Sequence, residues 1–65
     1  TFRALLAAVR YHAARVLLHT SALSLEDIAN KLGYADVTAF ARAFRRWSGA
    51  SPAVWRRQAA AAFRG

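Results

Sequence analysis

The sequence predicts an all-α fold, a small bundle of about four helices of which the first is the longest. Apolar residues recur at spacings of three and four in several segments, which is the period of helices that bury one face. Glycine, or serine followed by proline, separates these segments. β-Branched residues are few and never alternate with polar ones, so no strand is expected. The 65 residues leave room for a single domain, residues 1–65.

The first helix is expected over residues 2–19. Its apolar residues fall at helical spacing, and Arg3, Arg10 and Arg15 lie mostly off their stripe. The arginines also interrupt the apolar stretch, so it is neither a membrane span nor a signal peptide. We expect an amphipathic helix whose apolar face is formed by Phe2, Leu5, Leu6, Val9, Ala13, Val16 and Leu17.

The second helix is expected to follow Ser24, whose hydroxyl is a good N-cap, and to stop at Gly33. Glu26 and Asp27 lie in its first turn, where the helix dipole favours negative charge. Glycine tolerates the left-handed conformation that a C-terminal turn requires, so the chain should turn at residue 33. The buried side of this helix should consist of Leu25, Ile28, Ala29 and Leu32.

The third helix is expected over about residues 37–47, with Asp36 as its N-cap and Gly49 as its end. One side of its helical wheel should face the core and carries Phe40, Phe44 and Trp47. The other side carries Val37, Thr38, Ala41, Arg42, Arg45 and Arg46. A capped helix, a glycine turn and a second helix with a basic outer side make a helix-turn-helix, so we expect one over residues 24–47.

The basic side of the third helix suits the major groove of DNA. Arginine can donate two hydrogen bonds to guanine or to a phosphate, and threonine can bond either a phosphate or a base edge. The methyl groups of Val37, Thr38 and Ala41 can pack on a thymine methyl. We therefore predict sequence-specific binding of double-stranded DNA by Val37, Thr38, Ala41, Arg42, Arg45 and Arg46.

A fourth helix is expected over residues 52–62, because Ser51 can cap it and Pro52 suits the first helical position. Trp47 and Trp55 could stack on single-stranded bases, but their place on the core side favours packing. The buried edge of this helix should consist of Trp55, Ala59, Ala62 and Phe63.

The charge of the chain points to a polyanionic partner. Ten Lys and Arg residues against three Asp and Glu give a net charge of +7. The alternative to DNA is that the chain is a basic helical module that contacts an acidic protein or an anionic membrane surface through its first helix. The grouping of arginines on one side of the third helix favours DNA.

Metal binding and catalysis are not expected. His12 and His19 lie seven residues apart on one helix, roughly 10 Å along its axis, and no third ligand is near in sequence. Glu26 and Asp27 are adjacent and point in different directions on a helix, and no cysteine is present. We expect no metal, no cofactor and no enzymatic activity.

These residues together resemble the C-terminal DNA-binding region of the AraC/XylS family of transcriptional regulators. Tyr34 and Trp55 stand where Phe and Tyr are more usual in that family, and both substitutions keep the bulk of the core. The resemblance covers about residues 10–56, and many correctly spaced positions make it specific. It is carried by Arg10, Ala14, Leu17, Leu18, Leu25 to Leu32, Gly33, Tyr34, Asp36, Phe40 to Arg46, Gly49, Ser51, Pro52, Trp55 and Arg56.

Members of this family carry two helix-turn-helix units joined by a long linker helix, usually beside an effector or dimerisation domain. The resemblance implies a homeodomain-like bundle preceded by a linker helix at residues 2–19, with the second unit at 24–47 and a C-terminal helix at 52–62. It implies a piece of a longer cytoplasmic regulator whose first unit and effector or dimerisation domain are absent here. RNA polymerase is then a further candidate partner.

The resemblance also bears on the DNA-facing positions. In some members the second unit lies mostly on the phosphate backbone, which implies backbone contacts by Arg45 and Arg46 ahead of base reading by Thr38 and Arg42. Ala41 stands where the family often has a small hydroxyl residue, and this change removes one polar contact.

Overall fold

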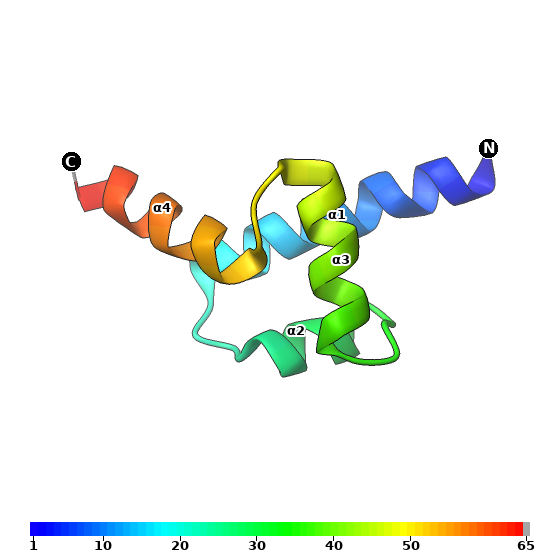
Figure 1. Cartoon of the computed structure of the whole chain (residues 1–65), viewed down its shortest axis with the longest axis horizontal. Helices are drawn as coiled ribbons and strands as arrows, with labels where there is room; N and C mark the ends of the chain where they lie inside the picture. The colour runs from blue at the N-terminus through cyan, green and yellow to red at the C-terminus, as the bar shows by residue number, and fades with distance from the viewer. Residues whose placement is uncertain (65) are drawn as a thin grey trace.

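The computed structural model describes the backbone of residues 1–64 and the side-chain surroundings of residues 1–62. Over this part of the chain it contains four helices and no strand (Figure 1). The helices are α1 (Phe2–Thr20), α2 (Leu25–Lys31), α3 (Val37–Ser48) and α4 (Pro52–Arg64). The predicted all-α bundle is confirmed, with the long first helix as one of the four.

The helices begin and end where the local sequence signals place them. The Ser24 hydroxyl accepts from the Asp27 N–H at 3.1 Å, and the Asp36 carboxylate accepts from the Ala39 N–H at 2.8 Å. Gly33 and Gly49 follow α2 and α3 with φ of 88° and 82°, a region that side chains rarely adopt. Both N-caps and both glycine turns are therefore confirmed.

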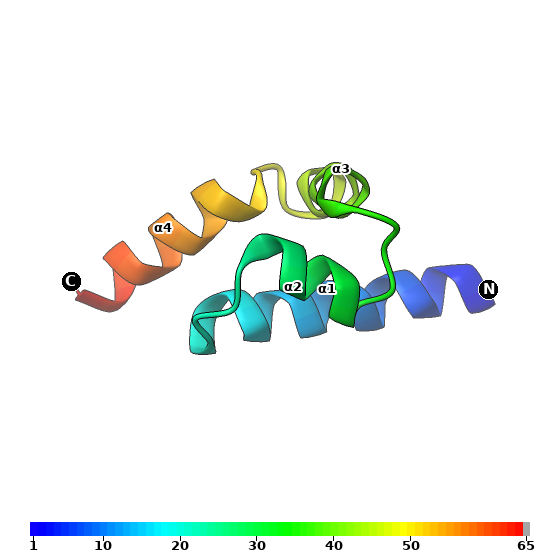
Figure 2. The same cartoon turned by 90° about the horizontal axis from the view of Figure 1, so that it is seen from below.

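The direction of α3 differs from that of the other helices. It crosses α1 steeply and is seen end-on in the view in which α1 and α4 run across the picture (Figure 2). The first turns of α1 extend beyond the bundle at one end and α4 extends at the other (Figure 1). Within residues 1–64, no other helix covers the side of α3 that faces away from α1 and α2 (Figure 2).

The core forms where α1, α2 and α3 meet. Each of these helices contributes two side chains that are at most 2% exposed, namely Ala14 and Leu18, Ile28 and Ala29, and Phe40 and Phe44. The Tyr11 ring lies 5.5 Å from the rings of both Phe44 and Trp47. The Trp55 ring meets the Phe44 ring edge-on at 5.8 Å. Both tryptophans pack in the aromatic cluster, as the sequence predicts.

The predicted apolar face of α1 is wrong for four of its seven residues, whereas Leu6, Ala13 and Leu17 are half-buried. Phe2 is 77% exposed and Val9 is 57% exposed, and Leu5 and Val16 are exposed as well. The face that packs is instead centred on Ala14. At about 100° per residue, Val9 and Val16 lie nearly opposite Ala14 on the helix. α1 thus has apolar residues on two sides, and helical spacing alone could not show which side the other three helices would cover.

Arg56 ties α4 to the end of α1. Its Nε donates to the Leu18 carbonyl at 3.0 Å, and Nη2 donates to the Ser21 carbonyl at 3.4 Å. The last carbonyls of a helix have no partner within the helix, and a cation there also interacts favourably with the dipole. Arg56 therefore stabilises both the end of α1 and the docking of α4.

The buried edge of α4 is shorter than predicted. Trp55 and Ala59 are half-buried, but Ala62 is exposed. The reason is that the last turns of α4 extend away from the rest of the bundle (Figure 1). The side chain of Phe63, the fourth residue predicted for this edge, lies outside the described residues.

Single substitutions should distinguish the buried core from the exposed apolar stripe of α1, which consists of Phe2, Leu5, Val9 and Val16. Phe44→Ala should lower the free energy of unfolding by about 3 to 5 kcal/mol, because it removes a fully buried ring and leaves a cavity. Val9→Ala, on the exposed stripe, should change it by less than about 0.5 kcal/mol. Urea denaturation followed by far-UV circular dichroism measures both values. A loss at Val9 comparable to the loss at Phe44 would contradict the packing described here.

Candidate nucleic-acid interface

The burial of Phe40 and Phe44 decides which side of α3 faces outward. Both rings are completely buried, and Trp47 on the same side is half-buried. A helix is a rigid unit with 3.6 residues per turn, so fixing one side fixes the other. The polar residues predicted to face DNA are accordingly exposed, namely Thr38, Arg42, Arg45 and Arg46.

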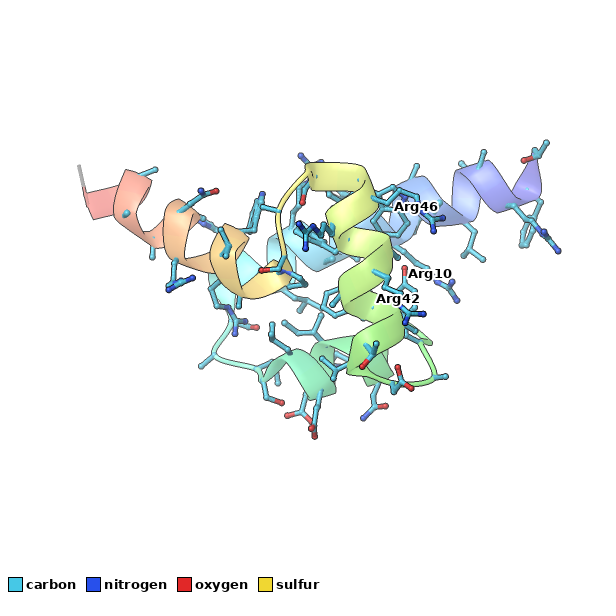
Figure 3. The ribbon with its side chains drawn as sticks, viewed as in Figure 1. Arg10, Arg42 and Arg46 are labelled. Atoms are coloured by element: carbon cyan, nitrogen blue, oxygen red, sulfur yellow. The ribbon has the colours of Figure 1, made fainter. Side chains whose placement is uncertain are left out.

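The arginines of α3 do not all lie on one line. Figure 3 shows Arg42 and Arg46 extending from the same side of α3, where Arg10 of α1 extends as well. Arg45 lies instead beside the turn that leads to α4, where it lines a shallow hollow with Gly49, Ala50, Ser51, Val54 and Gln58. The exposed side of α3 therefore presents guanidinium groups toward both of its flanks.

Val37 and Ala41 are placed differently from the four exposed residues. Both are half-buried. Val37 lines a small hollow with Asn30 and the acidic residues Glu26 and Asp36. The structure therefore separates Val37, at the acidic end of α3, from the arginines further along the helix.

The guanidinium groups of α3 are available to a ligand. Among the described residues, the side chains of Arg42, Arg45 and Arg46 take part in no hydrogen bond, ion pair or ring contact. Each retains a planar set of N–H donors that can bind a phosphate or a guanine edge in bidentate fashion. The arrangement can thus neutralise a polyanion without first breaking an internal salt bridge.

Arg10 lies at the turn of the helix-turn-helix, a placement that the sequence did not reveal. Its guanidinium carbon lies 4.9 Å from the centre of the Tyr34 ring. A Cβ atom built on Gly33 would approach an Arg10 guanidinium nitrogen to 3.2 Å. Burial raises the pKa of the Tyr34 hydroxyl, and the neighbouring Arg10 opposes part of this rise, so the ring is uncharged at neutral pH. The only sequence signal for Arg10 was its position within the family resemblance.

The histidines and acidic residues considered for metal binding and catalysis lie on α1 and α2. His12 and His19 are both exposed on α1, and the described residues contain no group of three potential metal ligands. Glu26 and Asp27 occupy the first turn of α2, where they face the positive end of the helix dipole. No helix within residues 1–64 is both long and apolar enough to cross a membrane.

Comparison with known proteins identifies relatives over most of the chain. A family described as "Helix-turn-helix domain" matches residues 1–58. The raffinose operon transcriptional regulatory protein RafR of Pediococcus pentosaceus is 45% identical over 53 residues, which are 82% of this chain and 19% of RafR. The HTH-type transcriptional regulator AlkR of Acinetobacter baylyi is 45% identical over 56 residues, covering 82% of this chain and 18% of AlkR.

A solved structure shares the fold as well as the sequence. The transcriptional regulator CdpR from Pseudomonas aeruginosa superposes with a TM-score of 0.80 at 42% identity. The match covers 85% of this chain and 18% of CdpR. The chain therefore spans less than a fifth of the length of each of these three relatives.

The two glycine turns offer a matched test of the contact between Arg10 and the turn. Gly33→Ala and Gly49→Ala should each lower the free energy of unfolding by about 1 kcal/mol, because alanine is strained at positive φ. Gly33→Ala should lower it further, by up to about 1 kcal/mol, because the new methyl pushes against the Arg10 guanidinium and weakens its stacking on the Tyr34 ring. The space around Gly49 is open within 4 Å, so that variant reports the backbone cost alone. Equal losses in urea denaturation would show that Arg10 adds nothing at the turn.

Proposed function

The chain belongs to the helix-turn-helix family of AraC/XylS-type transcriptional regulators, and on this premise we propose that it binds double-stranded DNA by placing the exposed side of α3 in the major groove. The observation that carries the proposal is the uncovered basic side of α3, which lies opposite two completely buried phenylalanines. A recognition helix needs this combination of an anchored inner side and an accessible outer side.

The residues of α3 take different roles in this proposal. On the helical wheel, Thr38 and Arg42 lie roughly opposite the buried Phe40, and we assign base reading to them. Arg45 and Arg46 contact phosphates on the two flanks of the groove, since each extends toward a different side of the helix. Ala41 is small and allows close approach. Val37 makes at most an apolar contact, because Glu26 and Asp36 line the same hollow and would repel a phosphate.

The chain acts in this proposal as part of a longer regulator. RafR, AlkR and CdpR are transcriptional regulators by name, and each is more than five times as long as the part that matches. We propose that residues 2–19 are a linker helix after a first helix-turn-helix unit, and that an effector or dimerisation domain and contact with RNA polymerase complete the function. Because DNA is the proposed partner, we propose the cytoplasm as the compartment.

The alternative of a basic module for acidic proteins or anionic membranes is not favoured. The exposed apolar stripe of α1 has the character of such a surface, but the relatives are regulators that share the helix-turn-helix itself. Binding to liposomes of anionic lipid that is tighter than binding to duplex DNA would reverse this preference.

The affinity for duplex DNA should depend steeply on salt. With Arg45 and Arg46 on phosphates and one or two further cations of this strongly basic chain beside them, contacts to three or four phosphates are expected. They predict a slope of about −3 for the logarithm of the association constant against the logarithm of the salt concentration. Fluorescence anisotropy with a labelled duplex measures this slope over a salt range of roughly 50 to 200 mM. A slope near zero would mean that binding does not proceed by phosphate neutralisation.

Substitution of Arg42 and Arg46 should separate base reading from backbone contact. A duplex selected from a random pool serves as the preferred sequence, and a scrambled duplex is the comparison. Arg42→Ala should cost about 1 to 3 kcal/mol on the preferred duplex and less on the scrambled one, whereas Arg46→Ala should weaken both about equally. If both variants weaken both duplexes by one common factor, Arg42 does not read bases.

A further inference from the structure

Arginines from two helices meet on one side of α3. Figure 3 shows Arg42 and Arg46 of α3 and Arg10 of α1 extending on this side. Packing holds this part of α1 against α3, because the ring of Tyr11, the residue after Arg10, lies 5.5 Å from the rings of both Phe44 and Trp47. The first helix thereby brings a cation to the flank of the proposed recognition helix.

The guanidinium of Arg10 is held in place at this position. It stacks on the Tyr34 ring at 4.9 Å, and that ring in turn lies 5.6 Å from the buried ring of Phe40. Gly33 leaves the space that the guanidinium occupies. Stacking uses the flat face of a guanidinium, and the N–H groups around its edge are those that donate to phosphate.

We propose that Arg10 binds a phosphate of the duplex that α3 enters, on the same flank as Arg46. The inference rests on the proposed function, and it adds a residue of the long first helix to the DNA-binding surface. Arg10 is only half-buried, so part of it remains accessible to solvent. Because Tyr34 already restricts the Arg10 side chain, a phosphate contact costs less conformational entropy here than it would for a mobile surface arginine.

Arg15 provides a matched control on the same helix. Its guanidinium also stacks on a tyrosine, with its carbon 4.6 Å from the centre of the Tyr11 ring. Arg15 instead lines a hollow with His12, Val16, His19, Thr20 and Trp55, where α1 faces α4. The two arginines therefore match in charge, helix and ring contact, and differ in the side of the bundle on which they lie.

The test compares salt slopes for the whole 65-residue chain on one selected duplex. Arg10→Ala should reduce the magnitude of the slope by about 0.9, as Arg46→Ala should, and Arg15→Ala should leave it unchanged. Between 50 and 200 mM salt, the fold-loss of affinity should be roughly three to four times smaller for the Arg10→Ala variant than for the parent chain. An unchanged slope for Arg10→Ala, or an equal reduction for Arg15→Ala, overturns the proposal.

A purely structural role of Arg10 would give different results. If Arg10 served only to hold Tyr34, Arg10→Lys would weaken binding as much as Arg10→Ala does, because lysine cannot form the planar stack. If Arg10 binds phosphate, Arg10→Lys keeps the positive charge and should retain the parent slope. Circular dichroism establishes that each variant is folded, and Arg10→Gln replaces Arg10→Ala in the slope measurement if the alanine variant unfolds.

The same measurements separate this inference from the proposed function. If the parent chain shows no salt-dependent binding, or if Arg46→Ala leaves the slope unchanged, the proposed placement of α3 on DNA fails. If Arg46→Ala reduces the slope and neither Arg10→Ala nor Arg10→Gln does, the proposed function stands and the role of Arg10 is overturned.

Discussion

The structure depends above all on the burial of two phenylalanine rings, Phe40 and Phe44, in the core that α3 shares with α1 and α2. A buried phenylalanine contributes roughly 1.5 to 3 kcal/mol, which matters in a domain too small for a large core. Both rings lie on α3, so the same burial that stabilises the fold also sets the rotation of this helix about its axis. The outward direction of Arg42 and Arg45 is a consequence of the core.

The positive charge of the chain divides into two parts with different physical roles. Arg56 donates to carbonyls at the end of α1, and Arg15 stacks on Tyr11, so both of these cations support the fold. The arginines of α3 have no partner among the described residues. Net charge alone therefore overstates the surface that can neutralise DNA, and the distribution over the helices identifies the part that can.

The turn between α2 and α3 connects these two roles. Gly33 adopts a positive φ, and its missing side chain leaves room for the Arg10 guanidinium. Arg10 stacks on Tyr34, which packs on Phe40, so the position of the turn relative to α1 is determined by contacts that reach the core. A recognition helix is useful only if its direction is well defined, and these contacts define it from the end at which the helix begins.

The sequence by itself determined the helices, the caps at Ser24 and Asp36, the glycine turns and the outward side of α3, because these depend on residues within a few positions of each other. The tertiary structure decided which side of α1 is buried. It also placed Arg10 beside Tyr34 and Arg56 at the end of α1, contacts that join residues 24 and 38 positions apart. Such pairs follow from how whole helices pack. The spacing of apolar residues within one helix does not indicate which other helix will pack against it.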